Sequence, residues 1–123
     1  MFILAMSRLI FIFSSYASAD LDPSIKVTIE EPVSGESYSG ISNLRGWAVS
    51  PNGIGKFYLN VLIDGEFAFH MSPYGERPDV AEAFPDYPGS ETGGFSMAFN
   101  YKNLDPGEHQ IKVIAFDDLE NYN

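Results

Sequence analysis

Apolar and polar residues tend to alternate in several short runs of this 123-residue chain. A period of two is the repeat of a half-buried β-strand, whereas an amphipathic helix repeats every 3.6 residues. Asp64-Gly65 separates two such runs and indicates a hairpin, because a type I′ turn needs positive φ at both central positions. The alternation predicts six strands, at residues 25–30, 41–49, 56–63, 66–70, 95–101 and 109–116. Short strands with turns between them predict a single all-β, antiparallel β-sandwich domain.

Residues 1–19 have a different composition from the rest of the chain. They are almost purely apolar, carry one charge at Arg8, and end in Ala17-Ser18-Ala19, a small-x-small cleavage signature. This pattern predicts a secretory signal peptide cleaved after Ala19, which leaves 20–123 as the mature domain. The alternative is an uncleaved N-terminal anchor, but Arg8 interrupts the run and a span needs about 20 apolar residues. We therefore expect a secreted, periplasmic or cell-surface protein with no membrane insertion after cleavage.

The charge balance and the lack of cysteine exclude several functions. The chain has seventeen acidic and seven basic residues, so the formal net charge is −10. Phosphate binding needs a basic patch, which argues against a nucleic-acid partner and against adhesion to anionic lipid. With no cysteine there is no disulfide, thiolate metal site or cysteine nucleophile.

The connection between the fourth and fifth predicted strands is unusually long. Residues 71–95 read MSPYGERPDVAEAFPDYPGSETGGF. Pro78 suits a first helical position and Pro85 stops the run, so a short helix is predicted over 78–84. Connections of this length are uncommon unless they are functional or internally packed. We expect this one to pack over Trp47, which alternation places on the face opposite Leu44 and Ala48.

Several short motifs resemble the bacterial immunoglobulin-like modules of secreted and cell-surface proteins. They are Gly46-Trp47-Ala48, Ile63-Asp64-Gly65, Arg77-Pro78-Asp79-Val80-Ala81, Gly94-Phe95 and Leu104-Asp105-Pro106-Gly107-Glu108-His109. The resemblance spans roughly residues 25–118. It implies an immunoglobulin-like or fibronectin III-like sandwich. It also implies a non-enzymatic role as a spacer, adhesion element or accessory domain.

The sequence departs from this family after residue 116. A sandwich of this type needs a final strand G beside strand F, and only seven residues follow, with turn chemistry. We expect strand G to be missing because the sequence is a fragment of a longer protein, truncated at the C-terminus. The alternative is an edge left open for a partner's strand.

No catalytic residue is predicted, and the chain is not expected to be an enzyme. No Gly-x-Ser-x-Gly, His-Glu-x-x-His or phosphate-binding loop is present, and no cofactor is indicated. His70 ends one strand and His109 begins another, and we expect the His109 ring to bond nearby backbone. Most carboxylates lie in turns or beside prolines, where water solvates them.

Four residues are candidates for ligand binding. Sugar sites use flat aromatic rings, so Trp47, Tyr74 and Tyr87 are candidates for a glycan surface. Arg77, the only cation in the long connection, is a candidate clamp for a carboxylate or sulfate. Packing of Trp47 under the loop, and organisation of the loop backbone by Arg77, are the favoured alternatives.

Calcium binding is a weak alternative, and no metal site is predicted. Calcium takes six to eight oxygen ligands converging from a loop. Asp79, Asp86 and Asp117 are the acids best placed to contribute, but no Asp-x-Asp-x-Asp-Gly spacing is present.

The sequence thus favours a non-catalytic extracellular interaction or spacer module of a secreted or cell-surface bacterial protein. Its partner would be a protein or glycan at the cell surface, or further domains of the same polypeptide, and not nucleic acid. One alternative is a carbohydrate-binding module using Trp47 and the loop tyrosines. Another is a subunit that accepts a partner's strand.

Overall fold

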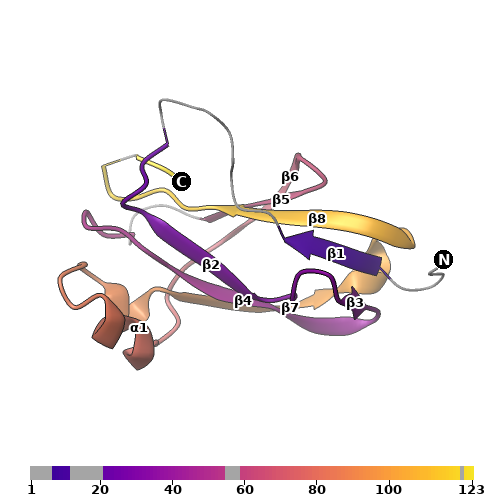
Figure 1. Ribbon diagram of the computed structural model, residues 1–123, viewed down its shortest axis with the longest axis horizontal. Coiled ribbons are helices and arrows are strands. Elements are labelled where there is room, and N and C mark those ends of the chain that lie inside the picture. The colour runs from indigo at the N-terminus through magenta and orange to yellow at the C-terminus, as the bar shows by residue number, and fades with distance from the viewer. Residues whose placement is uncertain (1–6, 12–20, 55–58, 120) are drawn as a thin grey trace.

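The computed structural model describes residues 7–11, 21–54, 59–119 and 121–123 (Figure 1). Eight strands are present in this part of the chain: β1 Ser7–Phe11, β2 Lys26–Glu31, β3 Ser37–Tyr38, β4 Ile41–Val49, β5 Leu59–Ile63, β6 Glu66–Met71, β7 Gly94–Asn100 and β8 Gly107–Ile114. One short helix and two 3-10 turns accompany them: α1 Pro78–Ala83, η1 Ser90–Thr92 and η2 Tyr101–Asn103. The predicted all-β class is confirmed.

The strands form two sheets. β2, β4 and β7 make an antiparallel three-stranded sheet in the order β2-β4-β7. β8, β5 and β6 are also antiparallel to one another, and β1 and β3 extend this second sheet to the order β3-β1-β8-β5-β6. β1 pairs with β8 in parallel and with β3 antiparallel. In Figure 1, β1 and α1 lie toward opposite ends of the molecule.

The core lies between the two sheets. Leu44, Ala48 and Phe95 from the first sheet join Leu59 and Ile111 from the second in one buried cluster. Leu44 and Ala48 lie on the face that alternation placed opposite Trp47. Burying each large aliphatic or aromatic side chain stabilises the fold by about 1.5–3 kcal/mol, so this shared face holds the two layers together.

Most predicted elements are present with small shifts at their ends. The strand predicted at 41–49 has the observed bounds of β4, and five other predicted strands correspond to β2, β5, β6, β7 and β8. Residues 56–58 of the third predicted strand lie outside the described residues. Asp64 and Gly65 have φ of 54° and 86°, as the predicted turn requires. The predicted helix is α1, which ends at Ala83, two residues before Pro85.

The structure describes only part of the predicted signal peptide. Residues 1–6 and 12–20, with the predicted cleavage after Ala19, lie outside the described residues, and only 7–11 are seen, as β1. Within the described part of the chain, no helix has the length and apolarity needed to cross a membrane.

The turn predicted after β8 is present, and the chain pairs back after it. Asp117 donates its backbone N–H to the Asn121 carbonyl, 2.8 Å away. Ala115 and Asn123 exchange two backbone hydrogen bonds of 2.9 and 3.0 Å. This short antiparallel pairing was not predicted from the sequence, which indicated only the turn.

Candidate functional site

The long loop, residues 72–93 between β6 and β7, is a folded unit tied to both strands. Gly75 and Gly94 exchange backbone hydrogen bonds of 2.8 and 3.0 Å at its base. Arg77 donates its backbone N–H to the Glu91 carbonyl at 2.7 Å, and the Ser90 hydroxyl donates to the Phe84 carbonyl at 2.9 Å. These bonds satisfy the irregular backbone within the loop itself.

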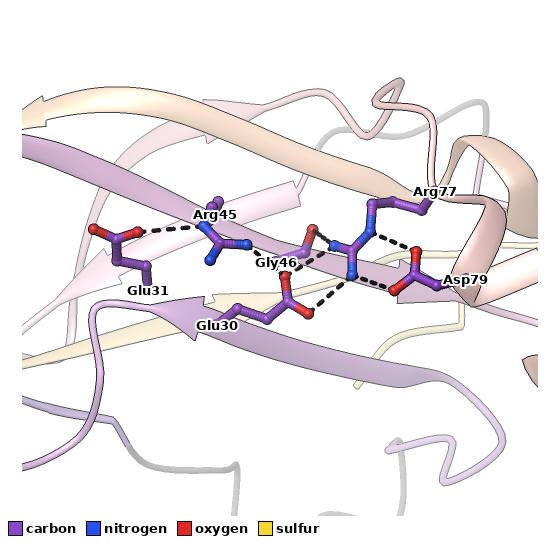
Figure 2. Close-up of polar contacts among 6 residues, drawn as sticks. All are labelled: Glu30, Glu31, Arg45, Gly46, Arg77 and Asp79. Carbon is purple, nitrogen blue, oxygen red and sulfur yellow. Dashed lines mark hydrogen bonds and ion pairs between the residues drawn. The ribbon is translucent and has the colours of Figure 1, made fainter.

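Arg77 is the centre of the polar contacts beneath this loop (Figure 2). Its guanidinium donates to both oxygens of Glu30 at 2.9 Å, and to both oxygens of Asp79 at 2.9 and 2.8 Å. A longer contact of 3.5 Å reaches the Gly46 carbonyl. Two bidentate carboxylate pairs use the planar fork of the guanidinium fully. The hydrogen bonds to Asp79 and then Glu30 raise the pKa of Arg77.

Arg45 continues the same cluster along the sheet. It donates to Glu30 at 3.0 Å and to Glu31 at 3.2 Å, as Figure 2 shows. Glu31 also accepts from the Ser42 hydroxyl at 2.7 Å, and this bond is the main reason that the pKa of Glu31 is lowered. The Arg45 side chain is 45% exposed and that of Arg77 is 21% exposed. Arg77, the more buried of the two arginines, therefore makes the more extensive contacts with carboxylates.

Gly46 explains how β2 and the Phe95 side chain of β7 can approach β4 so closely. A Cβ atom at this position would lie 1.9 Å from the Thr28 carbonyl oxygen and 2.8 Å from the Phe95 ring. Only glycine leaves room there, so the Gly-Trp-Ala motif has a steric cause.

Trp47 and Tyr87 belong to one aromatic stack. Trp47 is half-buried, and its ring contacts Phe84 of the long loop at 5.4 Å between centroids. Phe84 in turn contacts Tyr87 at 5.2 Å. The predicted packing of the loop on Trp47 is confirmed by this contact. Such tilted pairs add to the stability gained from burial.

Tyr74 is the fourth candidate for ligand binding. Its side chain is 62% exposed and lines a hollow of about 200 Å³. Pro73, Pro88, Gly93 and Asp118 also line the hollow. Trp47 and Tyr87 both contact Phe84, Arg77 pairs with Glu30 and Asp79, and Tyr74 lines this hollow.

The three candidate calcium ligands are not brought together. Asp79 is paired with Arg77, which lowers its pKa, Asp86 is exposed on the long loop, and Asp117 is buried after β8. No group of three or more histidine or acidic side chains is arranged to hold a metal ion among the described residues.

Asp117 organises the turn that follows β8. One carboxylate oxygen accepts the backbone N–H groups of Leu119 and Asn121, both at 2.9 Å. The other accepts from Ser50 and Asn52 at 3.0 Å and from the Asn121 amide at 3.2 Å. Burial, the largest effect, raises the pKa of Asp117, but the bonds from Asn52, Asn121 and Leu119 together leave it below its ordinary value.

His109 joins two turns. Its Nδ1 lies 2.7 Å from an Asp64 carboxylate oxygen, and its Nε2 contacts the Asp105 carbonyl. Both neighbours only accept hydrogen bonds, so both ring nitrogens donate when the imidazole is protonated. Burial lowers the pKa of His109, but the bonds to Asp105 and Asp64 outweigh it and raise the pKa overall. The predicted bond from the ring to nearby backbone is confirmed.

Three residues that take part in these polar contacts were not predicted from the sequence. Glu30 is the partner that Arg77 and Arg45 share, and Ser50 and Asn52 are partners of Asp117. Glu30 could have been placed on the outer face by the alternation of strand 25–30. Nothing local links Ser50 to an acid 67 residues later.

Comparison of the chain with protein-family models, curated proteins and solved structures finds no match. Its function is therefore inferred from the geometry just described.

Proposed function

We propose that this chain is a non-catalytic extracellular interaction or spacer module, built as an immunoglobulin-like sandwich. The strand order supports this fold proposal. β2-β4-β7 corresponds to strands A, B and E of such a module, and β8-β5-β6 corresponds to F, C and C′. The apolar N-terminal segment supports secretion to the periplasm, the cell surface or the medium.

One observation carries the functional proposal: the side chains with the best chemistry are engaged in holding the fold. Arg77 pairs with two carboxylates, Asp117 accepts five hydrogen bonds, and His109 bridges two turns. Arg77 or Asp117 would have to give up such bonds to bind a ligand, and charged groups that lose their partners are costly when covered. This favours a role carried out by surfaces of the domain over one carried out by reactive residues.

Of the three aromatic candidates, Tyr74 is the most exposed and the best placed for glycan binding. Its ring is exposed beside a hollow with two prolines, whereas Trp47 is partly covered by Phe84. A glycan array probed with the wild-type chain and with Tyr74→Ala tests the proposal. We expect no glycan to be retained by the wild-type chain. Glycan binding that Tyr74→Ala abolishes, without loss of cooperative unfolding, would replace the proposal with the carbohydrate-binding alternative.

A further inference from the structure

β8 can pair with a strand on each of its two sides, and β5 occupies one of them in an antiparallel arrangement. Asp64 donates its backbone N–H to the Gln110 carbonyl at 2.8 Å, so the polar groups of Gln110 face β5. Backbone groups of successive residues point to opposite sides of a strand, so those of Ile111 and Val113 face away from β5. We call this second side, over Gly107–Ile114, the β8 edge.

Segments distant in sequence pair along this side of the chain. β1 runs parallel to β8 in a register from Ser7 opposite Gly107 to Phe11 opposite Ile111. Ala115 continues the alternation of Ile111 and Val113, and it pairs with Asn123 in the opposite direction. The β8 edge therefore accepts strands, and β1 covers one stretch of it (Figure 1).

β1 has a strand on each side within its sheet. Its other side pairs with β3, with Ser7 opposite Tyr38. Tyr38 packs on Tyr101 at 5.1 Å between ring centroids, and Tyr101 is completely buried in the core. A strand on the β8 edge thus lies between two backbone partners and beside the apolar interior.

We propose that the β8 edge is a strand-acceptor site for an extended segment of a partner protein. Residues 7–11 occupy the site until the N-terminal segment is removed. The inference rests on the proposed extracellular interaction role, because cleavage after Ala19 would take β1 away from the mature chain. An edge with unpaired backbone groups binds an extended chain by adding a strand to the sheet.

The strand already seated there indicates the chemistry of the partner. Its sequence, SRLIF, has apolar residues at positions 9 and 11, and the register puts Arg8 opposite Glu108. The partner strand therefore has apolar residues at alternate positions and a basic residue at the place of Arg8. A basic strand also suits an acceptor chain whose net charge is −10.

The first experiment frees the edge in the full chain. Leu9→Pro with Ile10→Pro removes two backbone donors and prevents β1 from pairing. A peptide with the sequence of residues 5–13 is then titrated while backbone amide signals are followed by NMR. We expect it to shift the signals of 107–111 in the double variant. Binding to the wild-type chain should be at least about tenfold weaker, because its tethered β1 competes at high effective concentration.

A matched peptide carrying Leu9→Asp and Phe11→Asp is the control and should bind the double variant at least about tenfold more weakly than the natural peptide. Equal binding of the two peptides, or binding that leaves the signals of 107–111 unchanged, would overturn the acceptor site. It would leave the proposed module role standing, since the glycan array tests that role at Tyr74, away from this edge.

A second experiment keeps the inference testable if the proline variant does not fold. The chain has no cysteine, and Ile10 lies opposite the exposed Gln110, so Ile10→Cys with Gln110→Cys places two thiols in register. We expect the two thiols to form a disulfide within one chain. An excess of the natural peptide should slow this reaction at least about threefold. An unchanged rate of disulfide formation in the presence of the peptide would contradict the acceptor site. Disulfide-linked dimers would show that a second copy, and not another protein, supplies the strand.

Discussion

At the scale of single residues, Arg77 connects three segments that are far apart in the sequence. It binds Glu30 on β2, contacts the Gly46 carbonyl on β4, and binds Asp79 at the start of α1. A carboxylate or sulfate ligand would have to displace one of these acids. Arg77 therefore acts as a structural link between the long loop and the sheet.

Arg77→Ala should destabilise the fold by about 2 kcal/mol, since it removes charge-assisted hydrogen bonds at a largely covered site. Arg45→Ala is the matched control. It breaks pairs with Glu30 and Glu31 at a side chain that is 45% exposed, and it should cost about 0.5 kcal/mol or less. Urea unfolding of both variants measures the difference. Equal losses would contradict the structural role given to Arg77.

The role of Arg77 could be predicted from the sequence, but its main partner could not. A lone arginine in an irregular, acidic loop indicates that it organises backbone or pairs with an acid. The choice of Glu30 depends on β2 pairing with β4 in one register, which brings residues 47 positions apart within 2.9 Å. Alternation predicts which face a residue is on, and not which strand lies beside it.

At the scale of elements, the turn after β8 depends on a single buried carboxylate. Asp117 accepts two backbone N–H groups of the turn and three side-chain donors, two of them from residues just after β4. It thus fixes the end of one sheet to the end of the other. These bonds require the ionised form, which is why the pKa of Asp117 is lowered in the folded chain.

This lowered pKa predicts an acid-sensitive contribution to stability. The contribution is complete above the ordinary carboxyl pKa of 3.8 and is lost as the pH falls through the lower folded pKa. Asp117→Asn should therefore cost about 2 kcal/mol at pH 7 and less near pH 2.5, by urea unfolding at both pH values. Asp86→Asn, on the exposed loop, should change stability little at either pH. A cost for Asp117→Asn that does not shrink in acid would refute this reading.

The strands differ in how far local sequence determines them. β4 has a nine-residue alternating run and could be predicted at its observed bounds. β3 has only two residues, too few for a period, and exists through its pairing with β1. The apolar composition of residues 1–19 predicts a signal peptide, and the pairing of 7–11 with β8 depends on residues 100 positions away. Pairing of this kind follows from the whole fold and not from the segment.

At the scale of the whole molecule, two antiparallel sheets share one core, and each has a feature added to it. The long loop lies on the outer side of the β2-β4-β7 sheet through Trp47 and Arg77, and β1 lies on the β8 edge. The first feature is built into the domain by aromatic and charged contacts. The second is the strand that occupies the proposed acceptor site.

Trp47 is the only tryptophan in the sequence, so its fluorescence reports directly whether the long loop is a packed part of the domain. Acrylamide quenching of its fluorescence should be weaker in the native chain than in urea, and Phe84→Ala should increase quenching and shift the emission to the red. Phe67→Ala, at a ring that is 56% exposed on β6, should leave both unchanged. Native quenching as strong as in urea, with no effect of Phe84→Ala, would contradict the packed loop and return Trp47 to the candidates for ligand binding.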